Sequence, residues 1–317
     1  MSIDNRTIRI GTRGSPLALK QVEMVREALQ AVHPDLEAET VVIRTSGDWS
    51  PSDGEVRLSE KAGGKAQFAK EIEEALLDGA IDCAVHSMKD MDSVLPDGLV
   101  INHMLPREDV RDCLLFRDGF RDSQSLGDLP ENACIGTASV RRAAFLLAKR
   151  PDLKIEPLRG NVQTRIDKVR SGQVDASLLA IAGLKRLGLS DEADLVLNID
   201  EMLPAAGQGA VGIEMREGDQ EVADIFDVIN DKSTLLCVKA ERAVLKVLHA
   251  SCHSPLGVYA SLDNDEMIVR FCAARPDGSS VFEDEISESV HSLDEAQALG
   301  ARFGETLKPK LPSGILE

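Results

Sequence analysis

Apolar and polar residues alternate along the first two thirds of the chain in a way that predicts strands separated by helices. Short apolar runs are typical of buried strands, and apolar residues at helical spacing, as at Ala18, Val22, Val25 and Leu29, are typical of the helices between them. Ser15 and Pro16 have the character of an N-cap and a first helical residue. We therefore predict parallel pairing with crossover helices. The expected strands are 8–12, 40–45, 81–85, 99–105, 113–116, 134–137, 155–158, 176–182 and 195–199, and the expected helices are 16–29, 68–76, 139–149 and 162–169.

The pattern changes after Asp231. A long helix at 235–248 precedes a loop at 250–257, and three strand-like runs and a last helix follow at 258–262, 267–274, 280–286 and 293–307. The segment 204–214, rich in glycine and alanine, is interpreted as the chain crossing back to the first lobe, with a strand in its second half. We expect an α/β fold of two lobes around a cleft plus a small α+β domain. Its parts are a first lobe of 1–105 with 206–228, a second lobe of 106–205, and a C-terminal domain of 229–317.

Composition excludes several classes of partner. The 317 residues carry a formal net charge of −18, which disfavours polyanions, and only 3% are aromatic, too few to stack bases. We therefore expect no nucleic-acid partner, and any bound anion must be held by a local group of basic residues. The N-terminal segment lacks an apolar run of signal-peptide length, and no run reaches the length of a membrane helix. The expectation is a cytoplasmic protein without a membrane partner.

Cysteine and histidine spacing argues against disulfides and metals. The six cysteines include no CxxC, and the six histidines show no HExxH. Free thiols and no metal site are predicted.

Arginines gather where strands end and helices begin. Arg141 and Arg142 fall in the first turn of a predicted helix. A cation there interacts unfavourably with the helix dipole, at a cost of about 0.3–1 kcal/mol at an exposed site. A bound anion would reverse that penalty, whereas the alternative is that both side chains extend into solvent. Ligands of open α/β sheets bind outside the carboxyl ends of strands. The arginines at such positions, which suggest a ligand with several carboxylates, are Arg13, Arg141, Arg142, Arg159 and Arg165, with Arg186 after a predicted turn at 182–185.

Two further segments could carry chemistry. Ser87, Lys89 and Asp90 follow a predicted strand and bring a hydroxyl, an amine and a carboxylate together, although a surface turn with a Lys–Asp pair explains the spacing equally well. Cys252 lies in a loop beside His253, which could favour the thiolate. A lone loop cysteine is more often structural than catalytic.

Together these segments resemble the porphobilinogen deaminase family over nearly the whole chain. The segments that carry the resemblance are IGTRGSPLAL (10–19), GGKAQFAKEIEEALL (63–77), AVHSMKD (84–90), GTASVRR (136–142), LRGNVQTR (158–165), LAIAGLKRLG (179–188), PAAGQGAVGIE (204–214) and ERAVLKVLHASCHSPLG (241–257). The resemblance implies two periplasmic-binding-protein-like lobes with mixed, mainly parallel sheets, plus a small C-terminal α+β domain. It also implies a monomer.

The family joins porphobilinogen molecules head to tail with loss of ammonia and releases hydroxymethylbilane. By resemblance, a dipyrromethane cofactor is a thioether on Cys252, and Asp90 with Lys89 is catalytic. The implied cofactor contacts are Arg13, Ser15, Ser87, Lys89, Asp90, Thr137, Ser139, Arg141, Arg142, Arg159, Arg165 and Gln208. The implied substrate contacts are Arg13, Lys65, Phe68, Arg142, Arg159, Arg165 and Arg186.

The chain departs from the family pattern at a few places. Ala250 and Ser251 replace two glycines before the cysteine, Asp92-Ser93 replaces Val-Pro, and Ala66-Gln67 replaces Gly-Leu. No departure removes a charged or nucleophilic residue. The alternatives are a two-lobed protein that binds small anions without chemistry, or an inactive homologue. Fold alone permits the first.

Overall fold

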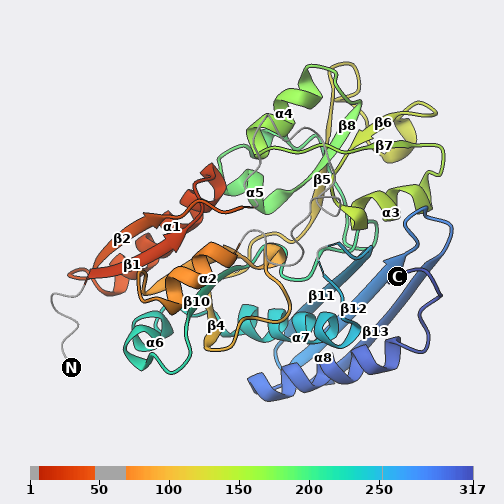
Figure 1. The fold of residues 1–317 in the computed structure, drawn as a ribbon. Helices are drawn as coiled ribbons and strands as arrows, with labels where there is room; N and C mark the ends of the chain where they lie inside the picture. The colour runs from red at the N-terminus through yellow and green to blue at the C-terminus, as the bar shows by residue number, and fades with distance from the viewer. Residues whose placement is uncertain (1–6, 47–68, 252, 317) are drawn as a thin grey trace.

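The computed structural model describes residues 7–46, 69–251 and 253–316. Figure 1 shows three units: a first lobe with the N-terminus, a second lobe beside it, and a C-terminal unit below the second lobe. Each unit is built on its own sheet. The mixed α/β class with a small C-terminal α+β unit is therefore confirmed.

The first lobe contains a five-stranded sheet in the order β2-β1-β3-β10-β4. β1 runs parallel to both β2 and β3, whereas β10 runs antiparallel to both β3 and β4. Its strands are β1 (Thr7–Thr12), β2 (Glu37–Val42), β3 (Cys83–Ser87), β4 (Leu99–Met104) and β10 (Val211–Arg216), and its helices are α1 (Pro16–Val32), α2 (Lys70–Leu77) and α6 (Gln220–Asp227).

Helices cover both faces of this sheet. Ser15 caps α1 by accepting a hydrogen bond from the Ala18 amide, and Pro16 is the first helical residue, as predicted. α1 and α6 bury Val22, Val25 and Phe226 against one face. The other face is covered by α2 and by helix α7 (Lys232–Leu248) of the C-terminal unit, in two smaller apolar clusters.

The second lobe repeats this topology in the order β7-β6-β8-β5-β9. Again two pairings are parallel and two are antiparallel, because β5 lies antiparallel between β8 and β9. The sheets are therefore mixed, with as many antiparallel as parallel pairings. The strands are β5 (Asp112–Phe116), β6 (Cys134–Gly136), β7 (Lys154–Glu156), β8 (Ala176–Ala180) and β9 (Leu195–Val196), and the helices are α3 (Val140–Lys149), α4 (Val162–Arg170) and α5 (Ile181–Arg186).

Three elements differ from the sequence-based prediction. The turn expected at 182–185 lies inside α5, because Ile181 and Leu184 bury their side chains in the second-lobe core. The second strand begins at Glu37, earlier than expected, because its backbone pairs with β1 from Thr7 onward. Helix α6 was not predicted, although Asp219 caps it by accepting from the Val222 amide.

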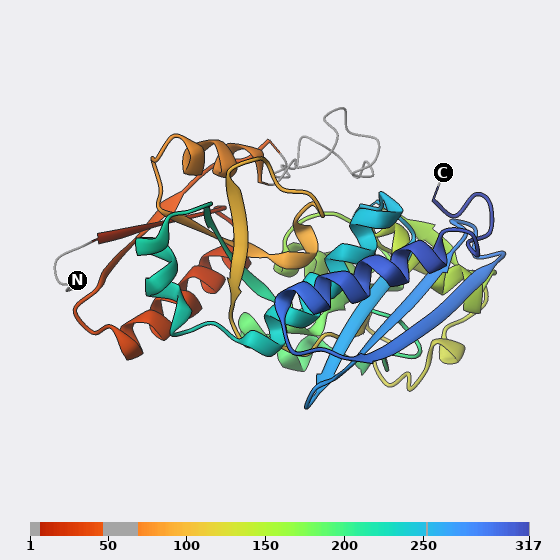
Figure 2. The ribbon, with the colours of Figure 1, turned by 90° about the horizontal axis from the view of Figure 1, so that it is seen from below.

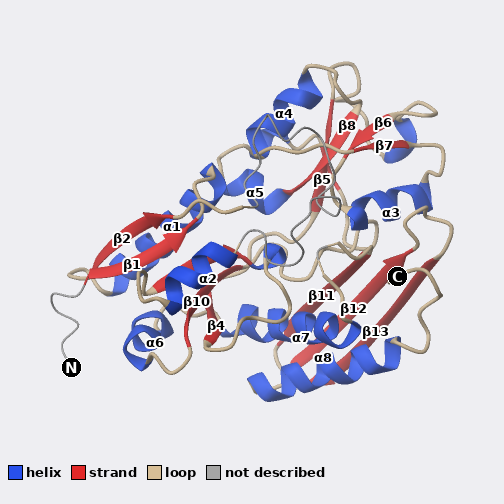
Figure 3. Ribbon diagram, viewed as in Figure 1, coloured by secondary structure: helices blue, strands red, loops and turns tan. Residues whose placement is uncertain are grey.

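The C-terminal unit is a three-stranded antiparallel sheet covered by two helices. The sheet, in the order β11-β12-β13, carries α7 and α8 side by side on one face (Figures 2 and 3). Asp231 caps α7, and His249 ends it in the left-handed conformation at φ 52°. The elements are α7 (Lys232–Leu248), β11 (Leu256–Asp263), β12 (Glu266–Ala274), β13 (Val281–Ser289) and α8 (Leu293–Leu307).

One buried carboxylate joins the three units. Glu241 on α7 accepts from Arg107 Nη1 at 2.7 Å, from the Gly207 amide at 2.6 Å and from the Ala260 amide at 2.8 Å. Arg107 and Gly207 lie on the two segments that cross between the lobes. The C-terminal unit therefore binds both of the segments that cross between the lobes. Among the helices that the structure describes, none combines the length and apolar composition that crossing a bilayer requires.

Candidate active site

The turn that carries Lys89 and Asp90 follows directly from β3. It is a short 3₁₀ turn, Met88–Asp90, in which Met88 is buried, Lys89 is partly exposed and Asp90 is exposed. Gly207 of the crossing segment packs beneath it. A Cβ on Gly207 would lie 2.8 Å from Met88 Cβ and 3.1 Å from the Lys89 amide nitrogen, and its φ of +72° suits glycine. The two backbones are thus in close contact.

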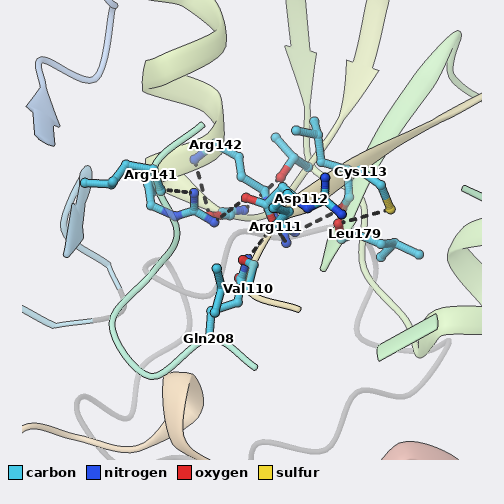
Figure 4. Close-up of polar contacts among 12 residues, drawn as sticks. Val110, Arg111, Asp112, Cys113, Arg141, Arg142, Leu179 and Gln208 are labelled. Atoms are coloured by element: carbon cyan, nitrogen blue, oxygen red, sulfur yellow. Dashed lines mark hydrogen bonds and ion pairs between the residues drawn. The ribbon is translucent and has the colours of Figure 1, made fainter. Parts of the chain in front are cut away.

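A buried ion cluster lies at the start of β5. Asp112 is fully buried, and its two oxygens accept from Arg141 Nη2 and Arg142 Nη2, each at 2.7 Å (Figure 4). Because β5 runs antiparallel to β8, the first residue of β5 lies opposite Ala180, at the carboxyl end of β8. The two arginines of the first turn of α3 therefore point to the sheet edge where a ligand was expected.

The remaining guanidinium donors are directed to carbonyl groups. Arg141 Nη1 donates to the Leu203 carbonyl at 2.7 Å, and Arg142 Nη1 donates to the Leu178 carbonyl at 2.9 Å. The side chains are only 4% and 6% exposed. Both are buried and paired, so the alternative that they extend into solvent is wrong.

The electrostatics of this cluster extend to the first lobe. Burial alone would raise the pKa of Asp112, but the charges and hydrogen bonds of Arg141 and Arg142 outweigh it and hold the pKa well below its ordinary range. Burial lowers the pKa of Lys89 to about 8, with Asp90 and Asp112 opposing the shift and the two arginines adding to it. The charge of Lys89 in the first lobe and the charges of the ion cluster in the second lobe thus influence each other electrostatically.

The crossing segment 204–210 supplies a further polar group. Gln208 is fully buried, and its amide nitrogen donates to the Val110 carbonyl at 2.7 Å and to Asp112 Oδ1 at 2.9 Å (Figure 4). Arg186, at the end of α5, donates to the Gly209 carbonyl at 2.7 Å. Both side chains therefore hold the crossing segment against the second lobe.

Arg13 and Arg159 follow the carboxyl ends of parallel strands, as predicted, whereas Arg165 lies inside α4. Arg13 is partly exposed in the turn between β1 and α1. Arg159 follows β7 and is 3% exposed, and Arg165 donates from Nε to the Gly160 carbonyl at 2.9 Å. Their roles toward a ligand stay predictions.

The predicted hydroxyl groups have local partners. Ser139 caps α3 by accepting from the Arg142 amide, and Thr137 accepts from the Ser139 amide. Ser87 accepts from Gln21 Nε2 at 2.7 Å, while Ser15 caps α1. Each hydroxyl therefore fixes a turn at the site, whatever else it binds.

Sequence reasoning missed Asp112 and Gln21. In the sequence, Asp112 was interpreted only as the start of the second series of strands and helices. A carboxylate directly before an apolar run, in a chain that also carries the neighbouring arginines Arg141 and Arg142, could have indicated a buried ion pair. Gln21 gave no signal, because its partner Ser87 is distant in sequence. Of the predicted residues, Lys65, Phe68 and Cys252 lie outside the described part of the chain.

The described residues beside Cys252 fit the rest of the fold. Ala250 is 5% exposed in the core of the C-terminal unit, and its amide donates to the Leu245 carbonyl at 3.0 Å. Ser251 exchanges local hydrogen bonds with its neighbours, donating from its amide to Ser254 Oγ and accepting from the His253 amide. Ala250 and Ser251, which replace two glycines of the family pattern, are thus accommodated by core packing and by local hydrogen bonds.

The residues present fit a ligand with several carboxylates. Within the described chain, the Nε atoms of Arg141, Arg142 and Arg186 are buried without a hydrogen-bond partner, and so is Gln208 Oε1. Buried polar atoms are rarely left so. Guanidinium groups match carboxylates in shape and charge. The described residues contain no group of three His, Cys, Asp or Glu side chains placed to hold a metal, and the cysteines among them are free.

Comparison with known proteins agrees with this chemistry. The family model "Porphobilinogen deaminase, dipyromethane cofactor binding domain" matches residues 8–224, and "Porphobilinogen deaminase, C-terminal domain" matches residues 235–309. The chain is 44% identical to the porphobilinogen deaminase of Syntrophotalea carbinolica, covering 99% of this chain and 96% of the relative. It is 43% identical to the chloroplastic enzyme of Oryza sativa subsp. japonica, with coverages of 98% and 86%.

Solved structures with some likeness include ligand-binding proteins. The BenM effector binding domain with benzoate has a TM-score of 0.43 at 18% identity, covering 71% of this chain and 91% of that chain. A YaeC-family lipoprotein from Enterococcus faecalis has a TM-score of 0.42 at 14% identity, with coverages of 73% and 93%. Likeness of this size says nothing about ligands. The family matches, by contrast, span nearly the whole sequence, and this chain belongs to the porphobilinogen deaminase family.

Proposed function

We propose that this chain condenses four porphobilinogen molecules head to tail, with loss of ammonia, onto a dipyrromethane tethered to Cys252 by a thioether, and then hydrolyses off hydroxymethylbilane. This is a transferase activity of tetrapyrrole and heme biosynthesis. Near full-length similarity to curated porphobilinogen deaminases supports it.

The observation that carries the proposal is the meeting of two charged groups from different lobes. Lys89 on one lobe, the neighbour of Asp90 in the same turn, lies within the electrostatic influence of Asp112 and the two arginines it holds. The arginines are buried, so their geometry is fixed before any ligand binds. A site with fixed cations and an exposed carboxylate suits a substrate with acidic side chains and a positive charge that develops during reaction.

The role proposed for each residue follows from its position in the site. A dipyrromethane bound here would supply the free pyrrole carbon to which the first substrate is joined, and each later substrate would join the terminal ring of the growing chain. Arg141 and Arg142, together with Lys89, hold carboxylates of the bound pyrroles, and Asp112 keeps the two guanidinium groups aligned. Asp90 faces the reacting ring, stabilises the positive charge left when ammonia departs, and exchanges protons with pyrrole nitrogens.

Other residues complete the contacts in this proposal. Cofactor contacts come from Arg13, Ser15, Ser87, Thr137, Ser139, Arg159, Arg165 and Gln208, and substrate contacts from Arg13, Lys65, Phe68, Arg142, Arg159, Arg165 and Arg186. The positions of Arg13, Ser15, Ser87 and Arg159 at or just after strand ends support these roles.

Intact-protein mass together with turnover tests the proposal. Purified protein should exceed its sequence mass by one dipyrromethane, peptide mapping should locate the adduct at Cys252, and added porphobilinogen should be converted to hydroxymethylbilane. A protein without the adduct and without turnover would be a binding module, and the proposal would fail.

Asp90→Asn tests the catalytic assignment separately. The variant keeps the shape of the side chain and removes its charge. Turnover should fall by about 10²–10⁴-fold, while the cofactor mass remains, since the residue is exposed and packs little. Turnover close to that of the wild type would remove Asp90 from the mechanism.

The same proposal includes the organisation of the chain and its surroundings. Three domains, 1–105 with 206–228, 106–205 and 229–317, are supported by the three separate sheets. The enzyme is proposed to be monomeric and cytoplasmic, with porphobilinogen as its small-molecule partner. The net charge of −18 supports the absence of a nucleic-acid partner.

A further inference from the structure

Three ionisable side chains are buried on the face of the first-lobe sheet covered by α2. Glu73 comes from α2, His86 from β3 and Glu214 from β10, and they are 6%, 7% and 0% exposed. We call them the acid–histidine cluster. It lies between the two apolar clusters of this face, one around Ile72 and the other around Met88.

A hydrogen bond in this cluster ties two strands together. His86 Nε2 lies 2.9 Å from Glu214 Oε2. In the antiparallel register His86 pairs with Gly212 and Glu214 pairs with Ala84, so the side chains meet diagonally across β3 and β10. Within the described chain, Glu214 Oε1 has no hydrogen-bond partner. His86 is thus the anchor of this carboxylate.

Charged groups from α2, from α7 and from the segment after the catalytic turn lie near the cluster. Burial raises the pKa of Glu73 to about 7, with Glu214, Asp92 and Glu74 adding to the shift and His86 opposing it. From α7, Arg242 faces Glu214 and Asp92, and burial lowers its pKa to about 10. The lobe therefore holds several ionisable groups where apolar side chains would fill the space at less cost in desolvation.

The position of the cluster along the chain connects it to the active site. His86 is followed by Ser87 and then by the Met88–Asp90 turn. On the far side of that turn, Arg242 donates to the Met91 carbonyl at 3.2 Å and to the Asp92 carbonyl. Buried polar contacts therefore hold the chain just before and just after the turn.

We propose that His86 and Glu214 are positioning residues for the reaction: their hydrogen bond fixes the end of β3 and so sets where Lys89 and Asp90 stand in the site. The inference rests on the proposed function for its kinetic readout. Neither residue reaches the reacting atoms in this account. Both act through the backbone of the turn.

Two replacements of similar size separate the hydrogen bond from the bulk of the side chain. His86→Gln retains an N–H donor near the position of Nε2, whereas His86→Leu does not. Measured per cofactor-loaded enzyme, His86→Leu should lower kcat by about 10- to 100-fold, because a small displacement of the catalytic group is costly. KM should change by less than about threefold, since the arginines proposed to hold the substrate's carboxylates lie on other segments. His86→Gln should keep kcat within about threefold of the wild type.

A second histidine–carboxylate pair in the same lobe provides the matched control. His103 Nε2 lies 2.7 Å from Asp227 Oδ1, and His103 is 4% exposed on β4, where it lies beside Phe226 on the opposite face of the sheet from the acid–histidine cluster. His103→Leu should lower the melting temperature and leave kcat unchanged. An equal loss of kcat in both leucine variants would indicate general loosening of the lobe and overturn the proposal.

A double variant keeps the test decisive if His86→Leu folds poorly. His86→Leu with Glu214→Leu removes both polar partners, so stability should recover. The kcat should stay low, because no directional bond fixes the turn. Wild-type kcat in the double variant, in His86→Leu alone, or a loss in His86→Gln equal to that of His86→Leu would each refute the positioning role. Absence of turnover in the wild type would instead count against the proposed function.

Discussion

Replacing Glu73 with glutamine should remove a loss of folding stability that the first lobe undergoes as the pH rises. Burial, reinforced by the charge of Glu214, raises the pKa of Glu73 from 4.5 to about 7 in the folded protein. In the unfolded chain the carboxyl returns to its ordinary pKa. The folded protein thus holds a proton that the unfolded chain releases.

The direction of the effect follows from proton binding. Below pH 4.5 the carboxyl is protonated in both states. As the pH rises, the unfolded chain ionises first, so the free energy of unfolding falls until the folded carboxyl also ionises at about pH 7. Each pKa unit corresponds to about 1.4 kcal/mol, so the full loss is about 3 kcal/mol. Glutamine resembles the protonated carboxyl and does not titrate.

Denaturant unfolding, followed by circular dichroism at several pH values, measures this. The variant should gain stability over the wild type by about 3 kcal/mol between about pH 5 and pH 8. Glu74→Gln, an exposed neighbour on the same helix, should show no such trend. A stability difference between Glu73→Gln and wild type that stays constant over this range would refute a proton held at Glu73.

Three other substitutions test the site. Asp112→Asn leaves two buried guanidinium groups without their counter-charge and should lower the free energy of unfolding by about 3–5 kcal/mol in chemical denaturation; a loss below 1 kcal/mol would mean that the ion cluster contributes little. Gly207→Ala forces a Cβ into the Met88–Asp90 turn and should reduce both kcat and melting temperature, whereas Gly218→Ala, at a similar φ of +79° with nothing within 4 Å, should affect only the melting temperature, and only slightly. Cys252→Ala should yield inactive protein without the added mass, with a melting temperature below wild type by a margin that shrinks in high salt; identical melting temperatures of variant and wild type at both low and high salt would contradict a stabilising cofactor.

Local chemistry made much of the fold and part of the site predictable. The cap at Ser15, the apolar stripe of α1 and the arginines after strand ends all depend on neighbours in sequence. Helix α5 was missed because its residues become helical by packing Ile181 and Leu184 into the second-lobe core. Here tertiary contacts decided the structure.

The partners of the site residues could not be predicted for the same reason. Asp112 meets Arg141 and Arg142 only because β5 enters the sheet antiparallel, which no local pattern of the strand reveals. Likewise, His86 and Glu214 belong to segments that sequence analysis recognised, but only the pairing of β3 with β10 brings them together. Register and strand order are properties of the whole chain.

The insertion of β10 into the first-lobe sheet sets the order in which the lobes can be completed during synthesis. β4 ends at Met104, and its neighbour β10 begins at Val211, after every strand of the second lobe has been made. The second lobe can therefore close its sheet as soon as Val196 has left the ribosome. The first lobe, though translated earlier, must wait with β4 and one edge of β3 unpaired, because their partner β10 is separated from them by a long stretch of chain whose loop closure is entropically costly. Although its first strands are at the N-terminus, the first lobe is thus the later of the two lobes to complete its sheet.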